Sequence, residues 1–487
     1  MTLPRRHLLR LAVAAAASPL LPRAAGAQAV RPLAERLADY AARLHYDDLD
    51  AATVERVKVL FIDTLGCAVA ALDERPVRLC REVALAAGGG PSTVIGTRSR
   101  ATPDLAAFAN GAAIRYHDLN DIYLPPQAGR QGAHPSDHIA PCLAVAEAER
   151  ASAAELITAI VLAYEINCRL ADAVDLGSRG WDAPVLSLPA VALAAGKLMK
   201  LAPGALAQAV SLALNDHISM GQTRAQMLSD WKGLADAEAA RNAVFAAMLA
   251  RAGISGPAPI FEGRWGFFQL VSGPADVDIG AFGGGGREFR VHRVGMKPYP
   301  VVVHAQSSVA AGIALAKEVG ALDRIAALEI ATTRRGHQMA GSEPEKWAPD
   351  TRETADHSLP YVAARAMFDG DIGHASFAPE KLRDPRILAF MRRITVRADP
   401  AFDTFPGAPP VRLTATLTDG ARVVRQVDNM PGFPGQPMTR ADVERKFRSN
   451  VGHRWPPART DAVLAALWTL ERTEDVSRLL GQFAVET

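Results

Sequence analysis

The chain has 487 residues, of which 49% are hydrophobic and 22% are charged, and its formal net charge is +2. This length exceeds one ordinary hydrophobic core, so we expect two domains. The composition is that of a globular, folded chain and excludes an intrinsically disordered one. The nearly balanced charge, without a block of basic residues, argues against nucleic acid as a partner.

The first 29 residues have the pattern of an export signal. Arg5-Arg6 precede an apolar run that ends at Leu21, and small residues follow around Ala25-Gly26-Ala27. This order is typical of a signal peptide, and the adjacent arginines favour the twin-arginine route to the periplasm. A basic amphipathic helix of the mature protein is the alternative. Neither this run nor any later segment is long enough to predict a permanent membrane span.

Residues 30–272 have the apolar spacing of one helix after another. Apolar side chains recur at helical intervals between Val57 and Ala68. Ser152 and Glu155 form a capping box ahead of a long apolar stretch, which predicts a helix start. We therefore expect an all-α domain here.

The pattern changes near residue 273, where a smaller α+β domain is expected to begin and to extend to residue 454. Apolar residues alternate along 394–398 and 411–417, as they do in strands. Asp419-Gly420 between two such runs predicts a hairpin. A C-terminal helical segment, 455–485, is expected to return to the first domain. The fold class is therefore mainly α with a second α+β domain.

The four cysteines have no Cys-x-x-Cys spacing and lie in helical patterns. Buried free thiols are the expected state in a protein of this size, although pairing is open to an exported chain. The spacing also argues against an iron–sulfur cluster of the usual kind.

The segment from Arg115 to Pro141 holds an unusual density of polar side chains. Asp118 and Asp121 are one helical turn apart and can face one cavity, with a solvated or capping pair as the alternative. His134 and His138 have a spacing that binds zinc on helices, but no third ligand accompanies them, so we expect no metal.

Three further clusters carry residues suited to proton transfer or anion binding. Lys232 follows Trp231 at a predicted helix start, where an exposed surface lysine is the alternative. Lys297 begins a Lys-Pro-Tyr-Pro sequence containing Tyr299, and His304 and Gln306 follow it. A last cluster, Asp356-His-Ser-Leu-Pro-Tyr361, precedes a helix, where buried capping is equally consistent. The sequence has no nucleotide loop, metal cluster or cofactor fingerprint, and these residue types suit proton transfer on a polyanionic small molecule.

Taken together and in order, these clusters resemble the MmgE/PrpD family, which includes 2-methylcitrate dehydratase, cis-aconitate decarboxylase and iminodisuccinate epimerase. The matching sequences cover residues 33–470: Asp118-Leu-Asn-Asp121, His134-Pro-Ser-Asp137, Gly180-Trp-Asp182, Ser229-Asp-Trp-Lys-Gly233, Phe261-Glu-Gly-Arg-Trp-Gly266, Lys297-Pro-Tyr-Pro300, His304-Ala-Gln306 and Asp356-His-Ser-Leu-Pro-Tyr361. The Trp-Lys-Gly and His-x-Gln variants look more like the dehydratase branch than the decarboxylase branch.

The resemblance implies a large helical domain with a smaller, lid-like α+β domain, a homodimer, and an active site that uses no metal or organic cofactor. It implies Asp118, His134, Lys232 and Lys297 as catalytic positions, the lysines binding carboxylates of a polycarboxylate substrate and the other two exchanging protons. Asp121, Tyr299, His304 and Gln306 are the implied substrate-binding residues.

The chain departs from the family pattern at three positions. Ile122 stands where relatives often carry threonine. Relatives commonly have a histidine at or beside the position of Asp182, where this chain has Ala183. Val302 stands where the decarboxylase branch has a second histidine. Losing these hydrogen-bonding groups is expected to change the substrate, the reaction or both. The main hypothesis is a lyase that removes water from a citrate-like hydroxy acid. Alternatives are a dicarboxylate epimerase, a decarboxylase of an unsaturated tricarboxylate, and a non-catalytic carboxylate-binding protein.

Overall fold

The computed structural model describes residues 31–127, 129–404 and 407–485. The predicted signal peptide, residues 1–29, lies outside the described residues. No helix within the described ranges combines the length and the apolar character needed to cross a membrane.

Helices make up the first part of the chain, as the apolar spacing predicts. Several of them, such as α6 and α7, are buried on nearly every side, which explains why their sequences are apolar all round. The predicted capping box is confirmed, because the Ser152 hydroxyl accepts from the Glu155 amide and the Glu155 carboxylate accepts from Ser152. The helices are α1 (Leu33–Arg43), α2 (Ala51–Ala70), α3 (Arg75–Ala86), α4 (Pro103–Arg115), α5 (Ile139–Ala148), α6 (Ala153–Ala173), α7 (Ser187–Leu198), α8 (Pro203–Asn215) and α9 (Ala235–Arg251).

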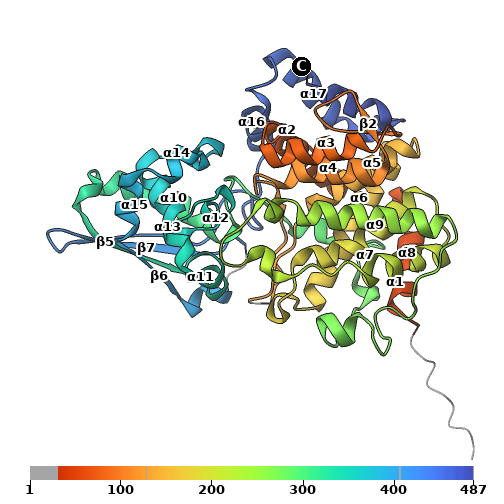
Figure 1. The fold of residues 1–487 in the computed structure, drawn as a ribbon, viewed down its shortest axis with the longest axis horizontal. Helices are drawn as coiled ribbons and strands as arrows, with labels where there is room; N and C mark the ends of the chain where they lie inside the picture. Colours follow the sequence, from red (N-terminus) through yellow and green to blue (C-terminus); the bar gives the residue numbers. More distant parts are fainter. Residues whose placement is uncertain (1–30, 128, 405–406, 486–487) are drawn as a thin grey trace, which may run out of the picture. The chain divides into compact units, whose positions relative to one another are not determined.

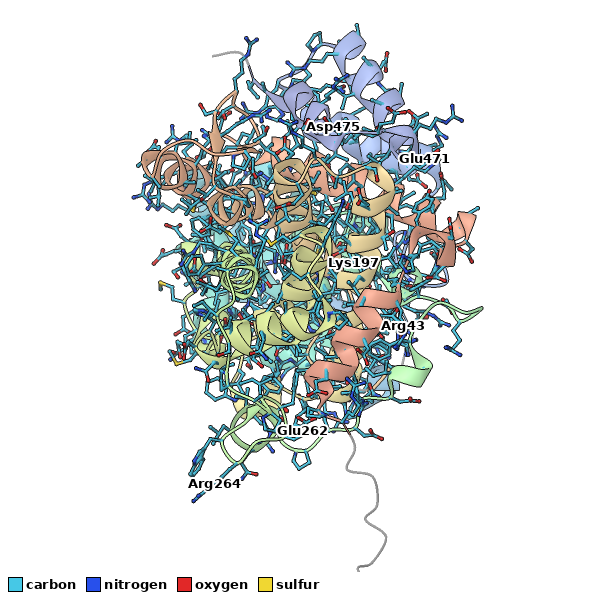
Figure 2. All side chains as sticks on the ribbon, turned by 90° about the vertical axis from the view of Figure 1, so that its right-hand side faces the viewer. Arg43, Lys197, Glu262, Arg264, Glu471 and Asp475 are labelled. Atoms are coloured by element: carbon cyan, nitrogen blue, oxygen red, sulfur yellow. The ribbon has the colours of Figure 1, made fainter. Side chains whose placement is uncertain are left out.

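Polar contacts fix the first helix, α1, to later parts of the chain. The Lys197 ammonium, at the end of α7, donates to the carbonyl of Ala41 over 2.8 Å, and Figure 2 shows this side chain beside α1. The Glu262 carboxylate accepts from the Leu33 amide at 2.7 Å. Both contacts satisfy groups at a helix terminus that the helix itself leaves without partners.

A four-stranded sheet forms the α+β part, in the order β6-β5-β7-β8 (Figure 1). β5 (Ile325–Thr332) pairs in parallel with β6 (Ile394–Ala398) and antiparallel with β7 (Val411–Leu417), which pairs antiparallel with β8 (Arg422–Val427). The predicted hairpin is confirmed, with Gly420 at a positive φ of 84°. Helices α10 (Gln306–Val319) and α13 (Leu359–Asp369) pack on one another, and α10 contacts β7 and β8. The shorter helices are α11 (Arg334–Ala340), α12 (Arg352–Ala355), α14 (Pro379–Leu382) and α15 (Pro385–Met391).

The hydrophobic cores divide the chain at different places from the predicted boundaries of 273 and 454. Val277, Val291 and Met296 belong to the core of the helical part, whereas the second core begins at Val301. At the other end, α16 (Arg440–Val451) and α17 (Pro457–Trp468) pack on α2. The segment 277–296 therefore lies with the helices, because its apolar residues are buried among them.

All four cysteines are buried and unpaired, as expected. Burial in apolar surroundings raises the pKa of the Cys80 thiol to about 11. Since the thiolate is the reactive form, this cysteine is inert near neutral pH.

Candidate active site

A short antiparallel pair of strands brings two of the predicted site residues together. β3 (Asp121–Ile122) pairs with β4 (Gly295–Met296), which places the end of the α4 loop beside the residues that follow β4. Asp118 lies just before β3 with a positive φ of 51°, a conformation that aspartate tolerates better than most residues. Lys297 lies just after β4, so a contact across 179 residues of sequence follows from the strand register.

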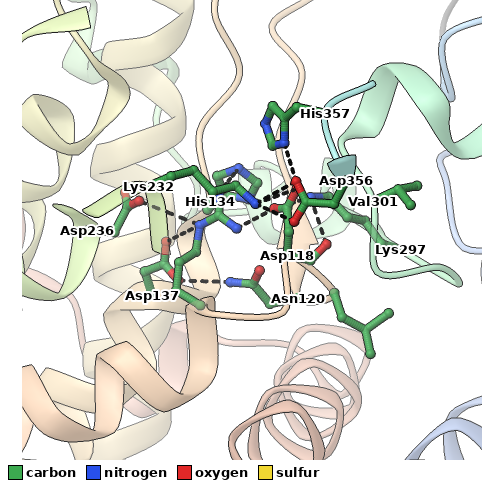
Figure 3. Close-up of polar contacts among 12 residues, drawn as sticks. Asp118, Asn120, His134, Asp137, Lys232, Asp236, Lys297, Val301, Asp356 and His357 are labelled. Atoms are coloured by element: carbon green, nitrogen blue, oxygen red, sulfur yellow. Dashed lines mark hydrogen bonds and ion pairs between the residues drawn. The ribbon is translucent and has the colours of Figure 1, made fainter. Parts of the chain in front are cut away.

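Asp118 lies at the centre of a fully buried set of ion pairs (Figure 3). One carboxylate oxygen accepts from Arg115 and, at 2.7 Å, from Lys297. The other lies 3.6 Å from the ammonium of Lys232. Burial opposes ionisation, but these three cations outweigh it and hold the pKa of Asp118 well below its usual range. Asp118 is therefore a permanent carboxylate.

Lys232 connects this cluster to a second carboxylate, Asp356. Its ammonium donates to both Asp356 oxygens, at 2.9 and 3.1 Å, and the whole side chain is buried. The Nδ1 of His357 lies 2.5 Å from an Asp356 oxygen. A carboxylate can only accept, so Nδ1 carries the proton and the Nε2 lone pair of neutral His357 stays open. Asp356 therefore fixes the orientation of the His357 ring, as a carboxylate that is hydrogen-bonded to a catalytic histidine does.

The position of Lys232 depends on contacts between the 228–232 loop and α12. The Leu228 amide donates to the Thr354 hydroxyl at 3.0 Å, and the Thr351 hydroxyl donates to the Leu228 carbonyl at 2.9 Å. Asp356 follows immediately after α12, at its C-terminal end. These two hydrogen bonds hold the loop against the helix and so bring Lys232 within reach of Asp356.

Two arginines neutralise further buried carboxylates beneath Asp118. Arg115 lies 3.6 Å from both Asp137 and Asp236, and Arg224 contacts Asp182 at 3.0 Å and Asp236 at 3.2 Å. Burial and the neighbouring Asp236 raise the pKa of Asp137 well above its usual range. The ion pairs of the site thus join four cations, Arg115, Arg224, Lys232 and Lys297, to the carboxyl groups of Asp118, Asp182, Asp236 and Asp356.

Both ring nitrogens of His134 are already engaged. Nδ1 lies 2.7 Å from the Asp121 carbonyl, which can only accept, so this nitrogen carries the proton. Nε2 then accepts from the Arg115 guanidinium at 2.9 Å. Burial and the nearby Arg115 and Lys297 hold the pKa of His134 well below 6.5. His134 is therefore neutral, and its contacts suit a residue that positions Arg115.

These groups surround an inner cavity of ≈ 60 Å³. Asp118, Lys297, His134, His304 and His357 line it, whereas Lys232 lies behind the wall. Part of the wall is apolar, and all three positions that depart from the family pattern belong to it. Its apolar lining consists of Ile122, Leu124, Ala183, Val302, Val303 and Met339.

Two of the lining groups have pKa values suited to proton transfer. Burial lowers the pKa of Lys297 to about 8, even though Asp118 attracts its charge. Burial and the charge of Lys232 lower the pKa of His357 to about 4. At neutral pH the cavity therefore holds a protonated amine that can give up its proton and a neutral imidazole that can accept one.

Asp118, Asp356 and His357 each offer an atom, all within 4.8 Å of one another, as the ligands of a metal ion do. The same carboxylate oxygens already bind Arg115, Lys297 and Lys232. A divalent cation added here meets three positive side chains at close range, so the donor set suits an ion-pair cluster better than a metal site. His134 and His138 also do not converge, because His138 contacts Ser187 at 3.0 Å.

Three predicted substrate-binding residues lie outside the lining of the inner cavity. One Asp121 oxygen accepts from the amide and hydroxyl of Ser136, and the other accepts from the Tyr164 hydroxyl at 2.8 Å. Asp121 and Asp118 diverge because the chain leaves the helix at Tyr116, and the expected shared helical face does not form. Gln306 donates to the carbonyls of Tyr299 and Val301, both at 2.8 Å. The hydrogen bonds from Gln306 to Tyr299 and Val301 support a role in holding the loop after Lys297 in place.

Several residues that line the inner cavity stand in sequences with no pattern that would identify them as site residues. Arg224 stands in an unremarkable Gln-Thr-Arg sequence, and Arg335 follows another arginine at the start of α11. Arg115 begins the polar segment but has the appearance of a helix-terminal cation. Only the Asp356-His357 pair, adjacent in sequence before a helix, has a pattern that points to an oriented base.

Two family models match most of the chain: the MmgE/PrpD N-terminal domain over residues 35–280 and the MmgE/PrpD C-terminal domain over residues 299–470. A 2-methylcitrate dehydratase from Cupriavidus necator is 29% identical over 92% of this chain and 96% of its own length. A cis-aconitate decarboxylase-like protein from Aspergillus oryzae is 26% identical over 92% and 97%. The human cis-aconitate decarboxylase is 24% identical over 88% and 89%.

Proposed function

The chain belongs to the MmgE/PrpD family, and from that premise we propose that it is a cofactor-independent lyase that removes water from a hydroxy di- or tricarboxylate. The observation that carries this proposal is the pair of opposite proton-transfer groups, Lys297 and His357, on the wall of one buried cavity. Relatives at 26–29% identity carry the name 2-methylcitrate dehydratase, which supports the reaction class.

We assign His357 as the base that takes the proton from the carbon beside a substrate carboxylate. Its Nε2 is unprotonated above pH 4, and Asp356 holds the ring and stabilises the imidazolium as it forms. A bound polyanion raises the pKa of His357 above this lowered value, because it favours the charged form. The imidazole therefore becomes a stronger base when substrate is present.

We assign Lys297 as the acid that protonates the departing hydroxyl group. Its pKa of about 8 leaves it mostly protonated at neutral pH, yet closer to release than an ordinary lysine. Proton removal beside a carboxylate builds negative charge on the substrate, and fixed cations nearby lower that cost. Lys297 and the arginines of the cavity wall supply this field.

The apolar part of the wall favours a substrate with an alkyl substituent. Ile122, Ala183 and Val302 offer no hydrogen bond, so a hydroxyl or carboxylate placed against them loses its water without replacement. A methyl or longer alkyl group gains from the same contact. The three positions therefore support an alkyl-substituted hydroxy acid over citrate itself.

The reaction is tested with the mature protein in heavy water and a panel of alkyl-substituted hydroxy-tricarboxylates and amino-dicarboxylates. Loss of water gives a conjugated acid with new ultraviolet absorbance, and this is the expected outcome. Epimerisation gives deuterium uptake without a new chromophore, and decarboxylation releases carbon dioxide; either result replaces the lyase. Calorimetric binding with none of these changes identifies a carboxylate-binding protein instead.

We also propose that residues 1–29 direct export to the periplasm by the twin-arginine route, on the support of the sequence pattern alone. Replacing Arg5-Arg6 by two lysines in the full chain is expected to retain the protein in the cytoplasm, and cell fractionation measures this. Arg23→Lys, which lies outside the arginine pair, is the control and is expected to leave export intact. Equal export of both variants contradicts the proposal.

We further propose that the protein forms a homodimer. Leu79 and Val83 are one turn apart on α3 and are 42% and 62% exposed, and exposed apolar side chains on one helix face favour association. Leu79→Glu with Val83→Glu is expected to reduce the molecular mass in sedimentation to that of a monomer. Leu270→Glu, at another exposed apolar residue, is the control.

A further inference from the structure

A second, larger cavity opens from the wall of the inner one. This outer cavity has a volume of ≈ 380 Å³ and is bounded largely by Tyr123, proline side chains and arginines. Leu124, Arg130, His304 and Arg335 line both cavities, and these four residues define the neck between them. The two cavities therefore adjoin at these side chains.

The two arginines of the neck differ from the other arginines of these walls. Arg115 and Arg224 contact buried carboxylates, Arg290 contacts Asp172 and Arg293 contacts Glu288. In the part of the chain that the structure describes, no carboxylate lies within 4 Å of the guanidinium of Arg130 or Arg335. Neither guanidinium is in an ion pair within 4 Å, although Arg130 donates to the Asp172 carbonyl and the more distant charges of Asp175 and Asp182 act on Arg335.

Arg335 also has hydrogen-bonding capacity that the protein leaves unused. Its Nη1 donates to Gln338 at 3.2 Å, but its Nε is buried without a partner among the described residues. The Nδ1 of His304 is in the same state. Gly177 leaves room for the guanidinium, because a Cβ atom at this position would lie only 3.1 Å from Nη2. A buried polar atom without a partner carries a cost that a ligand removes when it supplies the missing hydrogen bond.

We propose that Arg130, Arg335 and His304 form a carboxylate-binding subsite at the neck, which holds a second carboxylate of the substrate while the first reacts in the inner cavity. This inference rests on the proposed function, since it takes the ligand to be a polycarboxylate. An arginine fork matches a carboxylate in geometry and charge, so the subsite selects di- and tricarboxylates over monocarboxylic acids.

The subsite is tested with propane-1,2,3-tricarboxylate, which has no hydroxyl group and cannot be dehydrated. Calorimetry on the mature protein is expected to show Arg335→Gln and Arg130→Gln each weakening binding by roughly 10- to 100-fold, the size of a lost charged hydrogen bond. The matched control is Arg293→Gln, which removes the same charge from the outer cavity where Glu288 already pairs with it. The affinity of this control variant for the probe is expected to change by less than about threefold.

Equal weakening by Arg335→Gln and Arg293→Gln, or no binding of this probe to the unmodified protein, overturns the subsite. Arg335→Lys keeps the charge but lacks the guanidinium fork, so its affinity for the probe is expected to lie between those of the unmodified protein and Arg335→Gln. If Arg335→Gln does not fold, Arg335→Lys and Arg130→Gln provide the test of the subsite. Dehydration with an unchanged KM in Arg335→Gln removes the subsite and leaves the lyase. Arg335-dependent binding without any turnover removes the lyase and leaves the subsite.

Discussion

The ion-pair cluster around Asp118 and the neck between the cavities use the same residue types in opposite ways. In the cluster, Lys232 and Lys297 each contact a carboxylate, and nearly all of their surface is buried. At the neck, Arg130 and Arg335 have no carboxylate within 4 Å in the described ranges. The charged groups of the cluster are paired without a ligand, whereas the arginines of the neck would find their carboxylate partner in a bound ligand.

This difference separates positioning from binding. A buried charge with a partner is held in one place and provides a fixed field, but it has little attraction left for a ligand. An unpaired charge at a cavity wall attracts anions and gains from each hydrogen bond they supply. Changes in the cluster should therefore affect folding and the chemical step, and changes at the neck should affect substrate binding.

Lys232→Met is expected to have the largest effect, because it leaves two buried carboxylates without their shared cation. Breaking a buried ion pair on one side costs about 3–5 kcal/mol of stability. We expect a lower unfolding temperature, measured by calorimetry, and no detectable turnover. Lys200→Met, at an exposed lysine 3.6 Å from Glu155, is the control and should change neither. Unchanged stability in Lys232→Met would show that the cluster does not depend on this cation.

His357→Asn should reduce kcat by about 10²- to 10⁴-fold while the protein stays folded, since asparagine cannot take a proton. Binding of propane-1,2,3-tricarboxylate should change little, because His357 lies outside the neck. His138→Asn provides the control: this histidine is equally buried but contacts Ser187 outside the cavity lining. If both variants lose kcat to the same extent, His357 is not the base.

The pH profile of kcat/KM should fall on both sides of a plateau between about pH 4 and pH 8. Below pH 4 His357 gains a proton and cannot act as a base, and above pH 8 Lys297 loses the proton that it must donate. The upper decline is about tenfold per pH unit. Lys297→Arg keeps the charge but cannot release a proton, so it should lose most of its kcat, and its residual activity should lack the upper decline. Persistence of that decline in Lys297→Arg assigns the acid to another group.

Local signals in the sequence predict much of the fold but only part of the site. Ser152 and Glu155 act within one turn, and Asp419-Gly420 acts within one hairpin, so neither depends on the rest of the chain. The central strand β5 was not predicted from its sequence, Ile-Ala-Ala-Leu-Glu-Ile-Ala-Thr, because alanine, leucine and glutamate favour helices. Pairing on both edges with β6 and β7 overrides that preference.

Local sequence also fails to predict those contacts of the site that join residues far apart in the chain. Lys232 was identified from its local sequence, but its partner Asp356 is 124 residues away and its burial follows from that contact. The spacing of Asp118 and Asp121 predicts a shared face only if the helix continues, and the turn at Asp118 instead directs Asp121 toward Tyr164. Arg335 carries no motif, and its proposed role follows from its buried Nε, which has no hydrogen-bond partner among the described residues.

Asp121→Asn should have the smallest effect on activity and a distinctive effect on stability. Burial raises the pKa of Asp121 to about 6, although Ser136 and Tyr164 donate to its carboxylate. The folded protein therefore holds a proton between pH 4 and 6 that the unfolded chain releases, and stability falls by on the order of 3 kcal/mol as pH rises through this window. The difference in stability between the unmodified protein and Asp121→Asn should show that decline, because asparagine cannot titrate. KM should stay unchanged, since Asp121 does not line the inner cavity. A large increase in KM with a flat stability difference would instead make Asp121 a substrate ligand and move the boundary between positioning and binding residues.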